Sequence, residues 1–124
     1  MTLLTILNMP QNGSRPDKIC DLSYLNQMMF GNKEMIGEII NDFKKEIVVE
    51  IKHLQHAVST DEFLEIKRSA HKMLSTAGIM GILSLIPLLN EMEILGAEGN
   101  DMNRIKILAD KLKETCRLAI IELK

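Results

Sequence analysis

A regular spacing of apolar residues between positions 32 and 58 is the feature that most constrains the fold of this chain. Seven apolar side chains recur there at intervals of three and four residues, namely Ile36, Ile40, Phe43, Ile47, Ile51, Leu54 and Val58. Such spacing puts them on one face of an α-helix, and the charged residues mostly fall off that face. We therefore predict a long amphipathic helix over about residues 32–58.

The chain from Asp21 onward follows helical periodicity throughout, and no segment shows the alternation of apolar and polar residues that is typical of a β-strand. A short helix is predicted over about residues 21–30, beginning at an Asp cap and ending at Gly31. Residues 59–62 end the long helix and cap the next one, which runs to about Met80.

Two further helices follow. Ser84 is expected to cap the first, with Pro87 in its first turn, and Gly96 and Gly99 are expected to end it. The last helix begins at a cap formed by Asn100 and Asp101, and its apolar face consists of Ile105, Leu108, Leu112, Cys116, Ala119 and Leu123. Short connections force neighbouring helices to reverse direction. We therefore predict an all-α protein, an antiparallel up-and-down four-helix bundle with a short extra N-terminal helix.

Length and composition narrow the possibilities. The chain has 124 residues, which suits one domain. Residues 1–19 are predicted to be an irregular leader or linker, and residues 20–124 to form the bundle. A formal net charge of −2 argues against binding to nucleic acid. No apolar run approaches the ~20 residues needed to cross a bilayer, so no membrane insertion is expected. Cys20 and Cys116 fit no metal spacing, and Cys116 is expected to be a small buried hydrophobe. A cytoplasmic monomer is the default.

His71 lies outside the apolar face of its own predicted helix. That face consists of Phe63, Ile66, Ala70, Met73, Ala77 and Met80. At roughly 100° per residue, His71 falls about 130° from the middle of the face, so its imidazole is expected to project into solvent. An uncharged imidazole is a nucleophile near neutral pH.

The residues that share the helix face of His71 form a chemically specific patch. They are Leu64, Lys67, Arg68, Leu74, Ser75 and Gly78. The two cations can balance the negative charge of a phosphoryl group. The two small residues let a partner's backbone approach closely, and the two leucines suit a docking surface.

The stretch around His71 resembles the histidine phosphotransfer (HPt) domain of multistep two-component phosphorelays. Members of that family are four-helix bundles with an exposed His in the middle of a helix. The His is followed by an apolar residue two positions on, a small residue six on and often a Gly ten on. His71, Met73, Ala77 and Gly81 occupy these positions, and residues 21–25 look like the first short helix of the family.

Two positions depart from the family pattern. Leu74 stands where the family usually has Lys, and Ser75 stands where it usually has Gly. Lys67, Arg68 and Lys72 are the candidates to balance the phosphoryl charge in place of the missing Lys. The Ser75 hydroxyl is a candidate to bond the phosphoryl oxygens.

The resemblance implies a phosphorelay carrier. His71 would accept a phosphoryl group through Nε2 from a receiver-domain aspartate and pass it to another response regulator. The implied partners are receiver domains of response regulators or hybrid sensor kinases, and Mg²⁺ is expected only on the receiver. No Gly-rich phosphate loop or kinase motif set is present, so we expect a phosphocarrier without a cofactor of its own and not an enzyme.

Two alternatives stay open. The missing Lys is compatible with a helical module that is inactive in phosphotransfer and only docks or titrates a receiver domain. A remoter alternative is a di-metal bundle, because Glu50 and His53 have the Glu-x-x-His spacing of such sites. No second copy of that motif exists, and His53 with His56 would be a weak site, so no metal site is expected. Glu91 and Glu93 are expected to be solvated.

Overall fold

The computed structural model describes residues 18–123, and these form helices joined by short turns, without β-strands. The helices are α2 (Ser23–Met28), α3 (Lys33–Ser59), α4 (Phe63–Met80), α5 (Leu85–Glu98) and α6 (Met102–Glu122). The prediction of an all-α protein is confirmed for this part of the chain. The predicted leader, residues 1–19, lies outside the described residues except for Lys18 and Ile19.

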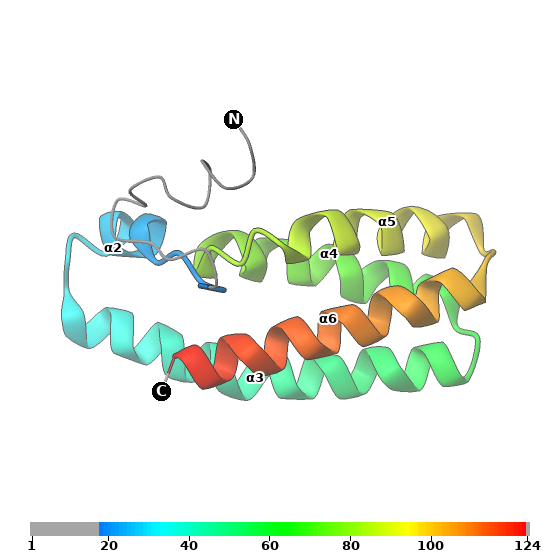
Figure 1. Ribbon diagram of the computed structural model, residues 1–124, viewed down its shortest axis with the longest axis horizontal. Coiled ribbons are helices and arrows are strands. Elements are labelled where there is room, and N and C mark those ends of the chain that lie inside the picture. Colours follow the sequence, from blue (N-terminus) through cyan, green and yellow to red (C-terminus); the bar gives the residue numbers. More distant parts are fainter. Residues whose placement is uncertain (1–17, 124) are drawn as a thin grey trace, which may run out of the picture.

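The four long helices lie side by side in a bundle-like arrangement, and each reverses the direction of the one before it (Figure 1). Helix α4 contacts both α3 and α5, and α6 also contacts both α3 and α5. The short helix α2 packs against α4. No helix within residues 18–123 is long and apolar enough to cross a membrane.

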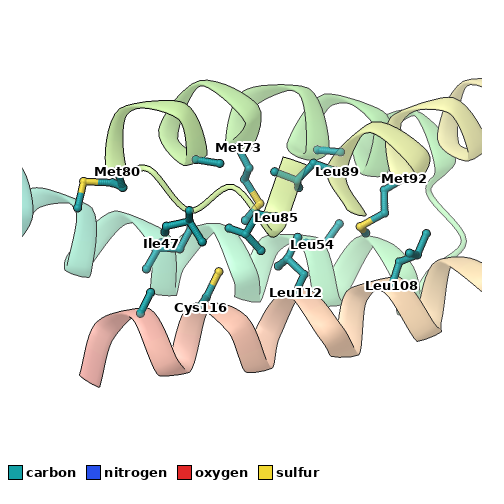
Figure 2. Close-up of a cluster of buried hydrophobic side chains, with 14 of the residues drawn as sticks. Ile47, Leu54, Met73, Met80, Leu85, Leu89, Met92, Leu108, Leu112 and Cys116 are labelled. Carbon is teal, nitrogen blue, oxygen red and sulfur yellow. The ribbon is translucent and has the colours of Figure 1, made fainter. Parts of the chain in front are cut away.

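The core lies between the α4–α5 pair and the α3–α6 pair, and Figure 2 shows side chains from both pairs meeting there. The apolar faces predicted from periodicity supply most of it. On α3, Phe43, Ile47, Leu54 and Val58 are buried. On α6, every predicted core residue is buried except the partly buried Leu123. Because one spacing rule accounts for these faces, local sequence is sufficient to define the core.

One predicted helix cap, at Asp101, is confirmed, and Asn32 forms a cap that was not predicted. The side-chain caps expected at the starts of α2, α4 and α5 are absent. The side-chain oxygen of Asn32 accepts a hydrogen bond from the Met35 N–H at 3.1 Å. Asp101 accepts one from the Arg104 N–H at 3.2 Å. Ser84, in contrast, makes no capping hydrogen bond, and its backbone is already helical.

Gly96 does not end α5, contrary to the prediction. It lies inside the helix and is buried, while Gly99 ends the helix with a left-handed φ of 70°. A Cβ at Gly96 would lie 2.9 Å from the Lys67 nitrogen and 3.0 Å from the Phe63 carbonyl oxygen. The absent side chain therefore lets α5 pass directly over the backbone of α4.

The segment before α2 is hydrogen-bonded to the C-terminal ends of α4 and α6. The Glu122 carboxylate accepts hydrogen bonds from the Ile19 N–H at 2.6 Å and the Cys20 N–H at 2.7 Å. One residue later, the Asp21 N–H donates to the Gly81 carbonyl at 3.0 Å. The Cys20 side chain is buried. Both cysteines are free thiols, and Cys116 is buried in the core as predicted.

Candidate functional site

His71 lies near the middle of α4, on the face that points away from the core. Its neighbours in sequence, Ala70 and Met73, are buried in that core, whereas the His71 side chain is 73% exposed. The helix backbone therefore presents the imidazole on a rigid support, in the direction that the periodicity predicts. A group in solution can reach the ring without any rearrangement of the fold.

Glu93 on α5 positions the imidazole of His71. Its Oε2 lies 3.0 Å from Nδ1 of His71. Since a carboxylate can only accept a hydrogen bond, Nδ1 carries the proton in this contact. In the neutral ring the lone pair then lies on Nε2, which has no hydrogen-bond partner within residues 18–123. The unengaged nitrogen is the nucleophilic one.

Glu91 and Glu93, expected to be solvated, are each paired with a residue on another helix, and Glu91 also keeps 39% of its side chain exposed. Glu91 accepts two hydrogen bonds from the Arg104 guanidinium, at 2.6 and 2.8 Å, and this pairing lowers the pKa of the carboxyl. Glu93 instead faces His71. Both contacts join different helices, so no pattern along one helix reveals them.

A shallow cavity of about 310 Å³ surrounds the imidazole. It is lined by Lys67, Arg68, His71, Lys72 and Glu93. The three cations predicted near His71 therefore do line the same cavity as its ring. Glu93 lies there too, although the sequence did not predict it. The cavity is open to solvent, and charged residues line it together with the imidazole.

Two of the three cations are engaged by carboxylates. Nη1 of Arg68 donates to Glu65 at 2.7 Å, one turn back on the same helix. Nζ of Lys72 lies 3.0 Å from Oε1 of Glu50, which is on α3. No ion pair within the described part of the chain involves Lys67, which is half-buried.

Glu50 is well anchored, and this matters for Lys72. Its second carboxylate oxygen accepts a hydrogen bond from the Ser69 hydroxyl at 2.7 Å. Burial by itself would raise the pKa of Glu50, but the hydrogen bonds from Ser69 and Lys72 outweigh it and the pKa lies below its ordinary value. The carboxylate therefore keeps its charge and draws Lys72 toward α3.

A second hollow, of about 410 Å³, lies on the C-terminal side of His71. It is lined by Tyr24, Met28, Leu74, Ser75, Gly78 and Ile79. Ser75 therefore lies in this hollow and not in the cavity around the imidazole. Sequence reasoning placed Leu74 and Gly78 on a docking surface but missed Tyr24 and Met28, because the packing of α2 against α4 decides their position.

Leu64 lies on the other side of His71, toward the start of α4, and is 54% exposed. Apolar surface therefore flanks the imidazole in both directions along the helix. A Cβ at Gly78 would meet no other atom within 4 Å, so this glycine leaves the surface open and does not serve internal packing. Such an arrangement suits contact with another protein.

The other two histidines, His53 and His56, lie toward the C-terminal end of α3. Each is near a carboxylate at the start of α4. Nε2 of His53 lies 3.5 Å from Glu65, and Nε2 of His56 lies 3.8 Å from Glu62. Between Lys18 and Leu123, no three His, Cys, Asp or Glu residues are placed to hold a metal ion together. Glu50, the partner of His53 in the Glu-x-x-His motif, is bonded to Ser69 and Lys72 instead.

The site combines an accessible imidazole, an oriented ring proton, nearby cations and flanking apolar surface. Chemically, it can form a covalent bond at Nε2 to an electrophile that another molecule presents. No protein-family model matches the chain, and no curated protein or solved structure matches it either.

Proposed function

We propose that this chain is a phosphorelay carrier that accepts a phosphoryl group on His71 from a receiver-domain aspartate and passes it to another response regulator. The proposal takes the four long helices as an antiparallel up-and-down bundle preceded by α2, as in HPt domains. It depends above all on one observation. The imidazole of His71 is exposed, its Nδ1 is bonded to Glu93, and its Nε2 is unengaged.

In the proposed reaction, the Nε2 lone pair attacks the phosphorus of the aspartyl phosphate. The N–P bond forms while the bond from phosphorus to the aspartyl oxygen breaks, and the carboxylate leaves with the electron pair. The ring retains its proton on Nδ1, and the carboxylate of Glu93 offsets the positive charge that the ring acquires. In the second half-reaction an aspartate oxygen attacks phosphorus, and the electron pair returns to Nε2.

The receiver would supply Mg²⁺, and the carrier would supply position. In phosphoryl transfer, position and electrostatic stabilisation account for most of the catalysis. The chain would thus act as a phosphocarrier without ATP-binding or kinase groups, and not as an enzyme. We further propose that it works in the cytoplasm as a monomer and binds receivers of response regulators or hybrid kinases.

The proposed docking surface runs along α4 on both sides of the imidazole. Leu64 would contact the receiver on one side, with Leu74, Gly78 and the hollow next to Tyr24 on the other. Because Gly78 has no side chain, a receiver loop can approach α4 closely near the phosphoryl group. Such a surface fits a partner whose aspartate lies on a shallow and partly apolar face.

Transfer from phosphorylated receiver domains tests the proposal. Receivers labelled with ³²P in the presence of Mg²⁺ are mixed with the full chain, and the label on the chain is followed. We expect an acid-labile, base-stable label. His71→Gln is expected to abolish it without changing the circular dichroism, because the side chain is exposed. The matched controls are His53→Gln and His56→Gln, which change the other exposed histidines and are expected to keep the label.

Two outcomes would contradict the proposal. Labelling that survives His71→Gln would reject the assigned nucleophile. Receiver binding without labelling would favour the alternative module that only docks or titrates a receiver, to which the apolar Leu74 at the family's Lys position also points.

A further inference from the structure

We infer that Lys67, one helical turn before His71, is the cation that neutralises the phosphoryl group carried on His71. This inference rests on the proposed function, and it answers a question that the sequence leaves open. The family's usual Lys position is occupied by Leu74, which is partly buried and packs against the core. The neutralising charge must therefore come from another residue.

The contacts of the other candidates argue against each of them. Arg68 donates to Glu65 at 2.7 Å, and Lys72 lies 3.0 Å from Glu50. To turn toward His71, each cation would have to leave a carboxylate without its charged partner. The loss would be greater for Lys72, because only 14% of the Glu50 side chain is exposed to water. Ser75 lines the neighbouring hollow next to Tyr24 and carries no charge.

Lys67 has the position and the freedom that the role requires. It lines the same cavity as His71 and Glu93, and no carboxylate within residues 18–123 forms an ion pair with it. Gly96 packs against its backbone, which fixes the starting point of the side chain, and no ion pair within the described residues holds its ammonium group. A lysine ammonium has three donors on a flexible stem and can follow the oxygens of a group that arrives and leaves.

The charge at the site creates the need for such a cation. A phosphoryl group brings nearly two negative charges at neutral pH. These would be added to a site where Glu93 already places a carboxylate 3.0 Å from the ring. A cation in the same cavity reduces the repulsion in the phosphorylated state and in the transition state that leads to it.

Potassium phosphoramidate is the probe for the test, because it needs no partner protein. The Nε2 lone pair attacks phosphorus, the P–N bond of phosphoramidate breaks, and ammonia leaves after taking up a proton. The full chain, Lys67→Met, Arg68→Met and Lys72→Met are compared by ³¹P NMR. Lys67→Arg retains the charge, and Lys113→Met removes an exposed cation from α6 as a control for net charge.

We expect Lys67→Met to slow phosphorylation about three- to fivefold, which is the size of effect that one partly exposed cation close to a phosphoryl group produces. The ³¹P titration of phosphorylated Lys67→Met is expected to show a higher pKa of the phosphoryl group, a change that a purely structural defect would not cause. Lys67→Arg is expected to restore most of the rate, and Lys113→Met to match the unmodified chain.

Two results would overturn the inference while leaving the carrier role intact. One is phosphorylation of His71 at an unchanged rate and with an unchanged phosphoryl pKa in Lys67→Met. The other is a larger effect from Arg68→Met or Lys72→Met than from Lys67→Met. Failure of the unmodified chain to become phosphorylated on His71, by phosphoramidate and by receivers alike, would overturn both proposals.

Discussion

Nδ1 of His71 on α4 lies 3.0 Å from Oε2 of Glu93 on α5, a contact between residues 22 positions apart in the chain. The contact selects one of the two neutral forms of the imidazole, the form with the proton on Nδ1. It also limits rotation of the ring and leaves Nε2 without a hydrogen-bond partner within residues 18–123. A carboxylate bonded to one nitrogen of a reactive imidazole commonly orients the other nitrogen for chemistry.

Two substitutions of Glu93 are expected to separate its effect on the orientation of the His71 ring from the effect of its negative charge. In Glu93→Gln the amide oxygen can still accept a hydrogen bond from Nδ1–H, whereas Glu93→Ala leaves the ring without a partner. We predict that ¹⁵N NMR of the neutral ring shows mainly the Nδ1–H form in Glu93→Gln and a gain of the Nε2–H form in Glu93→Ala. Phosphotransfer is expected to slow about tenfold in Glu93→Ala.

Glu91→Ala is the matched control for this prediction. It removes a neighbouring carboxylate on α5 that bonds Arg104 and not His71. Its NMR signals from His71 are expected to match those of the unmodified chain. A tautomer ratio and transfer rate that stay unchanged in Glu93→Ala would show that the contact has no part in orienting the nucleophile.

Gly96→Ala is expected to disturb the α4–α5 contact that brings Glu93 to His71. The added Cβ would lie 2.9 Å from the Lys67 nitrogen, which is backbone and cannot move aside alone. We predict a loss of about 1–3 kcal/mol in the free energy of unfolding, the usual cost of overpacking. Urea titration measures it.

The control for Gly96→Ala is Gly37→Ala. Gly37 is also helical, but a Cβ there meets no atom within 4 Å. Because Ala is the better helix former, this change is expected to stabilise the protein by about 0.5–1 kcal/mol. Equal effects of the two substitutions would mean that close packing at Gly96 does not matter.

The fold was largely predictable from the sequence, because periodicity and capping are local properties. The spacing of Ile47 and Leu54 on α3 and the cap at Asp101 required no knowledge of neighbouring helices. The prediction that Gly96 ends a helix was wrong because it, too, used only local sequence. A glycine near the end of a helical pattern signals an end locally, and only the approach of α4 shows that it permits close packing instead.

The site was predictable only in the part that belongs to one helix. The exposure of His71 follows from the phase of α4, and the pairing of Arg68 with Glu65 follows from their spacing of three. The contact with Glu93 depends on the rotation of α5 about its own axis and on the distance between the helices. Neither quantity is encoded in the spacing of residues along one segment.

Glu122 is expected to stabilise the fold by binding the segment before α2. Its carboxylate accepts hydrogen bonds from two successive backbone N–H groups, those of Ile19 and Cys20. Glu122→Ala leaves both donors without this partner, and we predict a loss of about 1–3 kcal/mol in the free energy of unfolding. Glu114→Ala, which removes an exposed glutamate on the same helix, is expected to have little effect.

Glu50 is expected to make stability depend on pH in the acid range. Its pKa is lowered in the folded state, since Ser69 and Lys72 outweigh the opposing effect of burial. Such a group stabilises the fold fully above its unfolded pKa, close to the ordinary value of 4.5, and the contribution is lost as the pH falls through the folded pKa. The stability difference between the unmodified chain and Glu50→Gln is therefore expected to be larger at pH 7 than at pH 3. A difference that grows toward acid pH would contradict the assignment.

The two thiols are expected to be inert in the folded protein. Burial, together with the nearby charge of Glu122, raises the pKa of Cys20 to about 12. Burial, with a further contribution from the neighbouring Cys20, raises the pKa of Cys116 to about 12. Since only the thiolate reacts, alkylation by iodoacetamide at pH 8 is expected to be slower than for an exposed cysteine by a factor of about 1,000. Both thiols are expected to react at once in denaturant. Glu122→Ala tests whether the raised pKa or limited access slows the reaction of Cys20. It removes the nearby charge and also the hydrogen bonds that hold the backbone at Ile19 and Cys20. If access controls the reaction, Cys20 will become reactive in this variant while Cys116, in the core, will stay protected.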